Sequence, residues 1–429
     1  MLDLSTLFFL HKRIYLQNMV KFDQEKINEI LSRGVEEVIG REHLLKKLQS
    51  GKTLRIKLGI DPTSPNIHIG RAIPLLKLRD FQDLGHKVVL IIGDSTGVIG
   101  DTSDKESERP MLNVKTVKEN MKTYAKQAGK ILDMKKCEIK YNSKWLLKLN
   151  YNDIGAQADR FSLHETIARE NIKKRLDEGK RVSLREVLYP LMQGYDSVAV
   201  KADVELGGTD QRFNLLAGRD IQKYYQQEPQ DIMTNPLIEG TDGRKMSSSW
   251  QNTINLLDSA DQMFGKTMSL PDELIVKYFT LATRVSLVEI EEIKKIPNPK
   301  DQKARLAFEI VKMYHGEKAA AKAAENFDKI FRRHEMPEEM PVLEIAPGKY
   351  NIVDLLCLPA LPTGKQAAGQ ATPLAPSKNE AKRLIEGGAV AITTGTEEQK
   401  ISDWKQIIQL QNDMVMQAGK RKFIRIKIK

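Results

Sequence analysis

A strand, a helix and a second strand follow one another between residues 54 and 92, and this order constrains the fold more than any other feature of the chain. Leu54–Ile60 and Val88–Ile92 are mostly apolar, as buried strands would be. Between them apolar residues recur at every third position, as on one helical face: Leu75, Leu78, Phe81 and Leu84. Strands joined through a helix pair in parallel, so we expect an α/β domain. Ligands bind beyond the carboxyl ends of such strands, which predicts a site at Asp61–Gly70.

Length and cysteine content exclude several classes of protein. A chain of 429 residues is expected to form two or three domains. Cys137 and Cys357 lie far apart with no histidine at ligand spacing, which argues against a disulfide framework and against a structural zinc site. We therefore expect a cytoplasmic, reducing compartment and no protein-built metal site. No apolar run reaches the about 18 residues of a membrane span.

The net charge of +11 suits a polyanionic partner. Residues 376–429 carry 11 Lys and Arg against 6 Asp and Glu, so the excess is concentrated near the end of the chain. Within it, Ile424, Ile426 and Ile428 alternate with basic residues, which predicts a strand with one cationic face. A cationic strand of this kind would contact phosphates without reading sequence.

The remaining chain divides by pattern. Residues 1–50 are expected to hold a weakly ordered extension before Met19 and one charged amphipathic helix over 24–48. Residues 51–257 form the predicted parallel-sheet domain, and helical patterns dominate 258–334. Three prolines and a glycine in 335–350 indicate a linker, and 351–429 is expected to be a small domain with a helix that starts at Ser377.

No glycine-rich phosphate loop is present, so another device must handle phosphates. His68 can hydrogen-bond a phosphate or a ring oxygen, and Gly70 has no side chain to keep a nucleotide off the backbone. A helix that begins there supplies free N–H groups, and Thr63 adds a hydroxyl. If His68 or Gly70 occurred alone, an ordinary loop residue would be the better interpretation. The complete segment from Pro62 to Arg71, placed after a buried strand, favours a nucleotide site.

Lys245 lies in a Ser-rich segment, Lys245–Ser249, that follows Asp242-Gly243-Arg244. A cation on a movable loop can stabilise charge as the transition state forms. Lys105 and Arg109 lie in a polar loop after Asp101 and are predicted, more weakly, to hold a leaving pyrophosphate. Their alternative is simple solvation.

A polar stripe interrupts the apolar helix expected over 187–200. Tyr189, Gln193 and Asp196 fall within about 60° of one another on a helix. Buried polar groups need partners, and a phenolic hydroxyl bound by Asp196 would be one. The alternative is that the stripe faces solvent.

A second polar turn follows at Gly207-Gly208-Thr209-Asp210-Gln211. Its glycines permit close approach of a ligand. We expect Asp210 to accept from ribose hydroxyls and Gln211 to face a substrate carboxylate or phosphate. A helix cap at Asp210 is the alternative, and the two roles are compatible.

The order of these motifs resembles that of the bacterial tyrosyl-tRNA synthetases, class I aminoacyl-tRNA synthetases, from about residue 25 onward. The matching segments are Gly59–Thr63, Asn66–Gly70, Thr96–Asp101, the Tyr189, Gln193 and Asp196 stripe, Gly207–Gln211 and Lys245–Ser249. The end of the chain resembles an S4-type RNA-binding domain through Pro376–Val390 and Gly419–Phe423. The resemblance implies a Rossmann-like catalytic domain, a helical domain on the anticodon side and a small α+β S4-like domain. It also implies a homodimer that activates tyrosine with ATP and Mg²⁺ and charges tRNA(Tyr).

The resemblance also implies roles for individual residues. Asp101, Tyr189 and Gln193 would hold the substrate ammonium, and Asp61, Gly208 and Asp210 would contact the adenylate. The predicted catalytic set is Thr63, His68, Arg71, Lys245 and Ser248, and the predicted RNA-binding set is Lys378, Lys382, Arg383, Lys420, Arg421 and Lys422.

The chain departs from the family pattern at three positions. Arg71 stands where the first signature usually has histidine, and Ser248 stands where bacterial members have a second lysine. Lys57 occupies the place of a tyrosine beside the substrate ring.

Three other functions fit part of this pattern. A related adenylyltransferase would use the same nucleotide site but would not need residues 258–334 or an S4-like end. A non-catalytic RNA-binding relative would tolerate the changes at Arg71 and Ser248. Tryptophan is the nearest alternative substrate, although Asp196 suits a phenol better.

Overall fold

The computed structural model describes residues 23–102, 111–332, 340–360, 373–395, 397–419 and 422–429. Contacts divide the chain into two compact units, residues 1–320 and residues 321–429. None of the helices in the described ranges is long and apolar enough to cross a membrane.

The first unit contains a six-stranded sheet in the order β1-β6-β5-β2-β3-β4. Its strands are β1 Glu37–Ile39, β2 Arg55–Ile60, β3 Lys87–Ile92, β4 Cys137–Tyr141, β5 Val204–Gly208 and β6 Asp231–Asn235. All neighbours pair in parallel except β1, which is antiparallel to β6. The predicted strand–helix–strand unit is confirmed: α4 Ile69–Asp83 connects β2 to the parallel β3. The α/β fold class is therefore correct.

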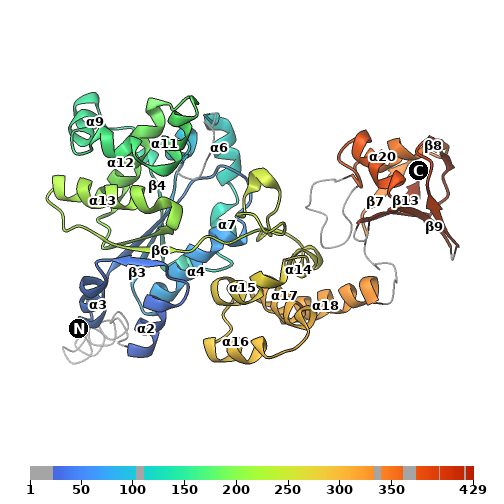
Figure 1. Ribbon diagram of the computed structural model, residues 1–429, viewed down its shortest axis with the longest axis horizontal. Coiled ribbons are helices and arrows are strands. Elements are labelled where there is room, and N and C mark those ends of the chain that lie inside the picture. Colours follow the sequence, from blue (N-terminus) through green and yellow to red (C-terminus); the bar gives the residue numbers. More distant parts are fainter. Residues whose placement is uncertain (1–22, 103–110, 333–339, 361–372, 396, 420–421) are drawn as a thin grey trace, which may run out of the picture. The chain divides into compact units, whose positions relative to one another are not determined.

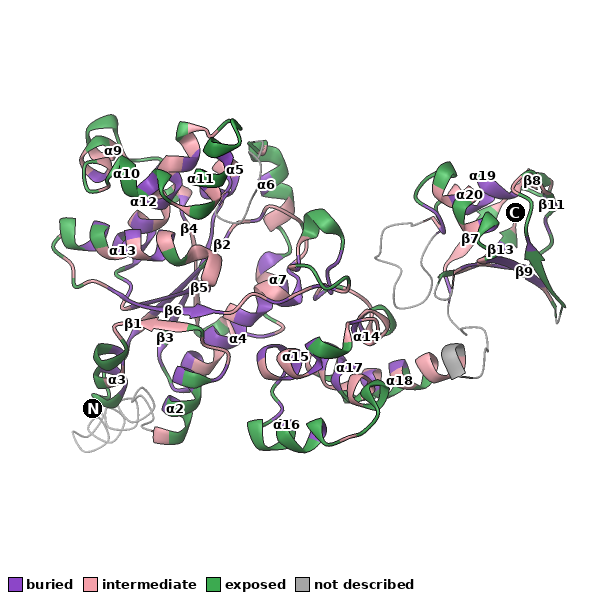
Figure 2. Ribbon diagram, viewed as in Figure 1, coloured by how far each residue is buried: buried purple, intermediate pink, exposed green. Residues whose placement is uncertain are grey.

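Helices cover both faces of this sheet. In Figure 1, α12 Leu184–Val200 and α13 Arg212–Tyr224 lie on one side, and α2 Gln24–Ser32, α3 Arg41–Gln49 and α4 lie on the other. The strands between them are largely buried, as Figure 2 shows. The other helices of this region are α5 Thr96–Ile99, α6 Val114–Met121, α7 Tyr124–Ala128, α8 Ser143–Leu146, α9 Tyr151–Ala158, α10 Leu163–Ile167 and α11 Glu170–Asp177, with 3-10 turns η1 Met134–Lys136, η2 Thr209–Gln211 and η3 Ser248–Trp250.

The strand order reverses at the centre of the sheet. From β2 the chain proceeds outward through β3 and β4 on one side, and β5 and β6 fill the other side. The loops that leave β2 and β5 therefore diverge, and a crevice opens beyond the carboxyl ends of these two strands. Residues 61–70 follow β2 and residues 209–211 follow β5, so both predicted polar turns border this crevice.

The prediction of one continuous helix over 24–48 is wrong. Helix α2 ends at Ser32, the strand β1 follows, and α3 begins only at Arg41. Gly34 and Gly40 have φ of +62° and +83°, a left-handed conformation that breaks the helix and that glycine adopts without strain. A Cβ at Gly40 would also lie 2.2 Å from the carboxylate of Asp231. Residues 37–39 thus belong to the sheet, not to a leading helix.

Helices fill residues 260–332, as the sequence predicts for 258–334. They are α14 Ala260–Met268, α15 Ile275–Ala282, α16 Leu287–Lys294, α17 Pro299–His315 and α18 Glu317–Arg332, with a 3-10 turn η4 at Asp272–Leu274. Asn298 caps α17 through Lys300 N, and Pro299 occupies its first turn, where a missing N–H costs nothing.

The second unit is a small α+β structure. A five-stranded sheet has the order β10-β9-β12-β13-β7, and β11 pairs with β8. The elements are β7 Val342–Ile345, β8 Lys349–Asn351, α19 Ile352–Cys357, α20 Lys378–Glu386, β9 Val390–Thr394, β10 Glu397–Ile401, β11 Ile407–Gln409, β12 Val415–Ala418 and β13 Lys422–Ile428. Ser377 caps α20, as predicted. In β13 the side chains of Ile424 and Ile426 are buried, which confirms the alternating strand.

The predicted linker over 335–350 is partly wrong. Residues 342–345 form β7, which pairs in parallel with β13 within the sheet of the second unit, and β8 begins at Lys349. The prolines at 341 and 347 flank β7 and lie outside its ladder, where a missing N–H does no harm. Residues 333–339 lie outside the described ranges.

Candidate functional site

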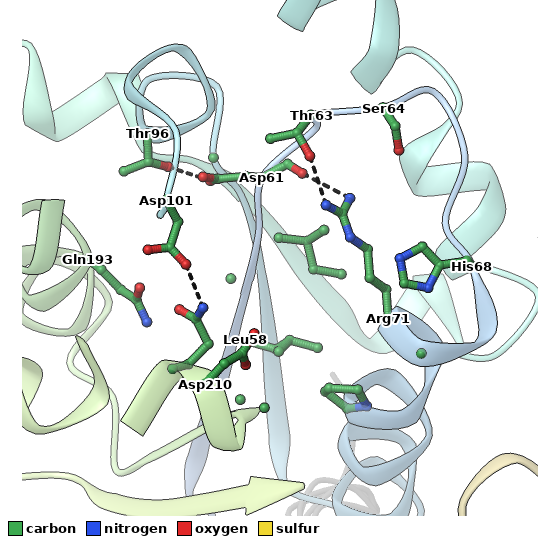
Figure 3. A pocket seen from close by; sticks show the side chains of 18 of the residues that line it. Leu58, Asp61, Thr63, Ser64, His68, Arg71, Thr96, Asp101, Gln193 and Asp210 are labelled. Carbon is green, nitrogen blue, oxygen red and sulfur yellow. Dashed lines mark hydrogen bonds between the residues drawn. The ribbon is translucent and has the colours of Figure 1, made fainter. Parts of the chain in front are cut away.

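A cavity of about 280 Å³ lies at the carboxyl end of the central strands, entirely within the first unit. It is lined by residues of β2, β5, α4, α12 and the segment from Lys245 to Ser249. The sequence-predicted residues in its lining are Asp61, Thr63, His68, Gly70, Arg71, Asp101, Tyr189, Gln193, Asp196, Gly208, Asp210, Gln211, Lys245 and Ser248. In Figure 3, Asp101 and Gln193 lie on one side of β2, and His68 and Arg71 lie on the other.

The nucleotide end is built on the start of α4. His68 is the extended N-cap residue, and Gly70 lies in the first turn. The prediction of free N–H groups is wrong here, because the Ile69 N–H donates to the Ile254 carbonyl and the Arg71 N–H donates to the His68 carbonyl. A Cβ at Gly70 would come within 3.1 Å of the His68 ring and 3.3 Å of Ile238. Glycine therefore keeps the backbone accessible between two close side chains, as the sequence predicts.

The Ser-rich loop closes onto this helix start. Met246 Sδ accepts from Gly70 N–H at 3.4 Å, and Ser64 Oγ and Ser248 Oγ are 3.2 Å apart. Lys245 Nζ donates to Asp210 Oδ2 at 2.9 Å. The two distant motifs thus meet across one cavity, and the lysine already touches the residue predicted to bind ribose.

Asn252 holds that loop, and sequence reasoning missed it. Its side-chain NH₂ donates to Asp242 Oδ1 at 2.7 Å and to the carbonyl of Lys245 at 3.0 Å. Its side-chain oxygen accepts from Ser247 N–H at 2.8 Å. Gly240 packs so close to this amide that a Cβ there would lie 2.3 Å from the Asn252 carbonyl. No local sequence pattern predicts these contacts, because they form only when the chain around Lys245 folds back against Asn252.

Arg71 is fixed to the turn after β2. Its guanidinium donates to Thr63 Oγ1 at 2.8 Å, to the carbonyl of Asp61 at 3.2 Å and to Tyr124 Oη at 3.1 Å. Figure 3 shows the first two of these bonds. The positive charge therefore stands at the edge of the cavity beside Thr63, held by three oxygen acceptors.

Asp61 links the two ends of the cavity. It accepts from Thr96 Oγ1 at 2.7 Å and from Tyr189 Oη at 2.8 Å. Gly93 leaves room for it, because a Cβ there would lie 2.0 Å from the carboxylate. Burial raises the pKa of Asp61 to about 6, against the opposing effect of these two hydrogen bonds.

The polar stripe on α12 faces the cavity, so the solvent-facing alternative is wrong. Tyr189 and Asp196 are 6% and 4% exposed, and Gln193 lines the same hollow. Ser183 is the N-cap of α12 and forms a capping box with Glu186, which fixes where the helix begins.

Asp196 has two partners that the sequence did not suggest. Trp145 Nε1 donates to Oδ1 at 2.7 Å, and Asn142 Nδ2 donates to Oδ2 at 3.2 Å. Burial raises the pKa of Asp196 to about 7, while the charge of Lys57 opposes that rise. Trp145 and Asn142 lie about 50 residues before Asp196, so only the tertiary fold brings them together.

Asp101 and Gln211 lie against each other. Gln211 Nε2 donates to Asp101 Oδ2 at 2.6 Å, and Asn214 Nδ2 lies 3.4 Å from Asp101 Oδ1. Asp210 belongs to the 3-10 turn before α13, whose N-cap is Gln211, so a capping role for Asp210 is wrong. Its carboxylate points to Lys245 instead.

The remaining predicted residues lie either outside the described ranges or in the second unit. Lys105, Arg109, Lys420 and Arg421 lie outside the described residues. The other basic residues belong to the second unit: Lys378 pairs with Asp354 at 2.8 Å, Arg383 pairs with Glu380 at 2.7 Å, Lys382 Nζ lies 4.2 Å from the Trp404 ring centroid, and Lys422 donates to the Leu374 carbonyl at 2.9 Å. Among the residues that the structure describes, no group of three or more His, Cys, Asp and Glu side chains is arranged to hold a metal ion.

Comparisons with known proteins agree with one another. The family described as tRNA synthetases class I (W and Y) matches residues 49–332. The chain is 48% identical over 404 residues to the tyrosine–tRNA ligase of Thermotoga maritima, covering 93% of this chain and 96% of that protein. It is 44% identical to the enzyme of the same name from Carboxydothermus hydrogenoformans, covering 93% and 97%.

Solved structures share the fold. A C-terminally truncated mitochondrial tyrosyl-tRNA synthetase from Coccidioides posadasii matches with a TM-score of 0.60 and 24% identity, covering 75% of this chain and all of that one. The tyrosyl-tRNA synthetase of Archaeoglobus fulgidus, solved with L-tyrosine, matches with a TM-score of 0.56 and 21% identity, covering 70% and 99%.

Proposed function

The chain belongs to the class I tRNA synthetases of the tryptophan and tyrosine group, and on that premise we propose that it is a tyrosine–tRNA ligase. It activates L-tyrosine with ATP to tyrosyl-adenylate and transfers the tyrosyl group to tRNA(Tyr). One observation carries the proposal: Gly70 at a helix start, Lys245 and the buried carboxylate of Asp196 line a single cavity.

Tyrosine would bind with its ring directed to α12. Its hydroxyl donates to Asp196, whose carboxylate is oriented by Trp145 and Asn142. Its ammonium would lie near Asp101, Tyr189 and Gln193, which all line the cavity. Tyrosine is preferred over tryptophan because the curated relatives are tyrosine–tRNA ligases, since an indole N–H can also donate to a carboxylate, as Trp145 does to Asp196.

ATP would lie over the first turn of α4. The ring of His68 and the bare backbone at Gly70 approach its phosphates once the Gly70 N–H leaves Met246 Sδ, and Asp210 accepts from its ribose. The tyrosine carboxylate then attacks the α-phosphate in line. The protein contributes orientation and charge: Lys245 moves from Asp210 toward the phosphates, and Arg71 stands fixed beside Thr63.

Mg²⁺ would enter with ATP. The described carboxylates form no three-ligand cluster, and this fits an ion that keeps its waters and binds mainly through substrate phosphates. The predicted pyrophosphate residues, Lys105 and Arg109, stay candidates for the leaving group.

The helices over 260–332 and the second unit favour tRNA as a substrate, because an adenylyltransferase that acts only on small molecules would need neither of them. We propose that residues 258–334 face the anticodon side and that the second unit binds tRNA phosphates through the basic residues of α20 and β13. We place this enzyme in the cytoplasm, in line with its two free cysteines.

We propose a homodimer as the working form. Large apolar side chains are exposed in the region from α8 to α12: Leu147, Tyr151, Leu163, Ile167, Leu176 and Leu184. Exposed apolar side chains on these helices would be stabilised by burial against a second copy. Sedimentation of a Tyr151→Lys, Leu163→Glu variant should show a monomer where the wild-type protein is a dimer; an unchanged mass would refute this interface.

Amino-acid-dependent pyrophosphate exchange with ATP tests the activity. Tyrosine should support exchange, and tryptophan should not. Phenylalanine should be worse by at least about tenfold, because it removes the substrate hydroxyl that donates to the buried Asp196, at a cost of about 1–3 kcal/mol. Exchange with another amino acid would redirect the assignment, and no exchange with any would favour a non-catalytic RNA-binding protein.

A further inference from the structure

A lysine is fully buried beneath the amino-acid end of the cavity. Lys57 lies on the central strand β2 and is 0% exposed. Its Nζ lies 2.9 Å from Glu205 Oε1 on the neighbouring strand β5, and both side chains are 1% exposed. Neither residue lines the cavity. The pair stands behind the substrate pocket, not inside it.

Both members of the pair reach the same turn of α12. Lys57 Nζ donates to Ser197 Oγ at 2.8 Å and to the carbonyl of Gln193 at 3.0 Å. Glu205 Oε1 accepts from Gln193 Nε2 at 3.1 Å, and Oε2 accepts from Ser197 Oγ at 3.0 Å and from Gln230 Nε2. All three protons of the ammonium thus have acceptors, and the backbone and side chains of one helical turn are attached to two strands.

That turn carries the polar groups of the pocket. Gln193 and Asp196 lie on it and line the cavity, and Gln193 is held by Glu205 through its amide. The positive charge of Lys57 lowers the pKa of Asp196, and the negative charge of Glu205 raises the pKa of Asp196. The pair therefore places two opposing charges behind the Asp196 carboxylate. Stability alone is a weak reason for such a pair, because desolvation offsets most of the attraction between its charges.

We propose that Lys57 and Glu205 are positioning residues for the substrate side chain. By pinning the turn from Gln193 to Ser197, they fix the Gln193 amide and the Asp196 carboxylate against the bound amino acid. The inference rests on the proposed tyrosine activation and adds determinants of its specificity that do not touch the substrate.

The main test is the double variant Lys57→Met, Glu205→Gln. It removes both charges together, so no buried charge is left unpaired and the protein should fold. In pyrophosphate exchange, the KM for tyrosine should rise about tenfold, equivalent to one or two misplaced hydrogen bonds, while the KM for ATP stays within about twofold. The preference for tyrosine over phenylalanine should fall with it.

A matched control is Lys77→Met. Lys77 is also buried, at 4% exposure, and its ammonium donates to the carbonyls of Ile30 and Arg33, away from the cavity. This variant should lose stability and keep the wild-type KM for tyrosine. An equal rise in tyrosine KM in the control would overturn the inference, because any buried lysine would then do the same.

Ser197→Ala provides a second measurement. It removes one contact of each charged partner without touching the pair, and the tyrosine KM should rise about threefold, the loss of one modest hydrogen bond. If the double variant does not fold, this variant decides. An unchanged KM for tyrosine in whichever folded variant is measured refutes the positioning role. Absence of tyrosine-dependent exchange in the wild-type protein would instead refute the proposed function, and the inference with it.

Discussion

Replacement of Lys245 by alanine is the sharpest test of the nucleotide site. In the structure its ammonium pairs with Asp210, and the loop that carries it contacts the first turn of α4 through Met246. The tyrosine end of the cavity, around Tyr189 and Asp196, is built from other elements. Lys245→Ala should therefore slow the chemical step and leave tyrosine binding almost unchanged.

The size of the effect follows from charge and distance. An ammonium about 4 Å from a developing negative charge contributes about 4 kcal/mol at an effective dielectric of about 20. Lys245 must first break its ion pair with Asp210. The side chains of Lys245 and Asp210 are 28% and 19% exposed. Such a partly exposed pair is worth at most about 1 kcal/mol. About 3 kcal/mol remains, which corresponds to a loss of about 10² in the rate of adenylate formation.

Single-turnover formation of adenylate measures the rate, and equilibrium binding of tyrosine measures the affinity. The matched control is Lys277→Ala: Lys277 pairs with Glu239 at 2.8 Å, is 34% exposed and does not line the cavity. The control should keep the wild-type rate. Equal losses of rate and tyrosine affinity in Lys245→Ala would show that the lysine supports the pocket and not the transition state, and the assignment would fail.

Three further predictions concern other parts of the chain. The affinity for tyrosine should fall as the pH drops from about 8 to about 6.5, because Asp196 has a pKa of about 7 and becomes protonated in this range. Calorimetric titration should show the fall in the wild-type protein and an affinity independent of pH in Asp196→Asn. In the structure the side chains of Arg175 and Glu186 are both 0% exposed and form an ion pair. Arg175→Met should lower the free energy of unfolding in urea by about 3–5 kcal/mol, because the buried Glu186 carboxylate loses its cationic partner; a change below about 1 kcal/mol would contradict this. Removal of residues 340–429 should spare pyrophosphate exchange and impair tRNA charging, and tRNA binding by the whole chain should weaken with salt; salt-independent binding would contradict the electrostatic account.

Local pattern was sufficient where an element is long and periodic. The parallel unit was predicted correctly from the apolar runs of β2 and β3 and from the three-residue spacing of apolar residues along α4. Such patterns arise because residues that face the core must be apolar, and they recur with the period of the strand or helix. The same rule failed for β1. A three-residue strand has no measurable period, and its pairing with β6, almost 200 residues later, determines its conformation.

Some residues of the site could be predicted from the sequence and others could not. His68, Lys245 and the stripe on α12 could be found by inspection, because each is a polar or charged residue in a turn, loop or apolar helix where a ligand is expected. Trp145, Asn142 and Asn252 could not, because each acts only through partners that the fold brings within hydrogen-bond distance. Lys57 stood out in the sequence, but only its contacts with Glu205 and α12 explain it.

By itself, the sequence determined which chemical groups are available and which segments must be buried, because apolar periodicity and residue type are properties of the chain. Only the tertiary structure decided the partners of those groups. Hydrogen bonds and ion pairs depend on distances between residues that are remote in sequence, such as Lys245 to Asp210 and Asp196 to Trp145. Such distances exist only once the sheet has assembled and its central strands have opened a crevice between diverging loops.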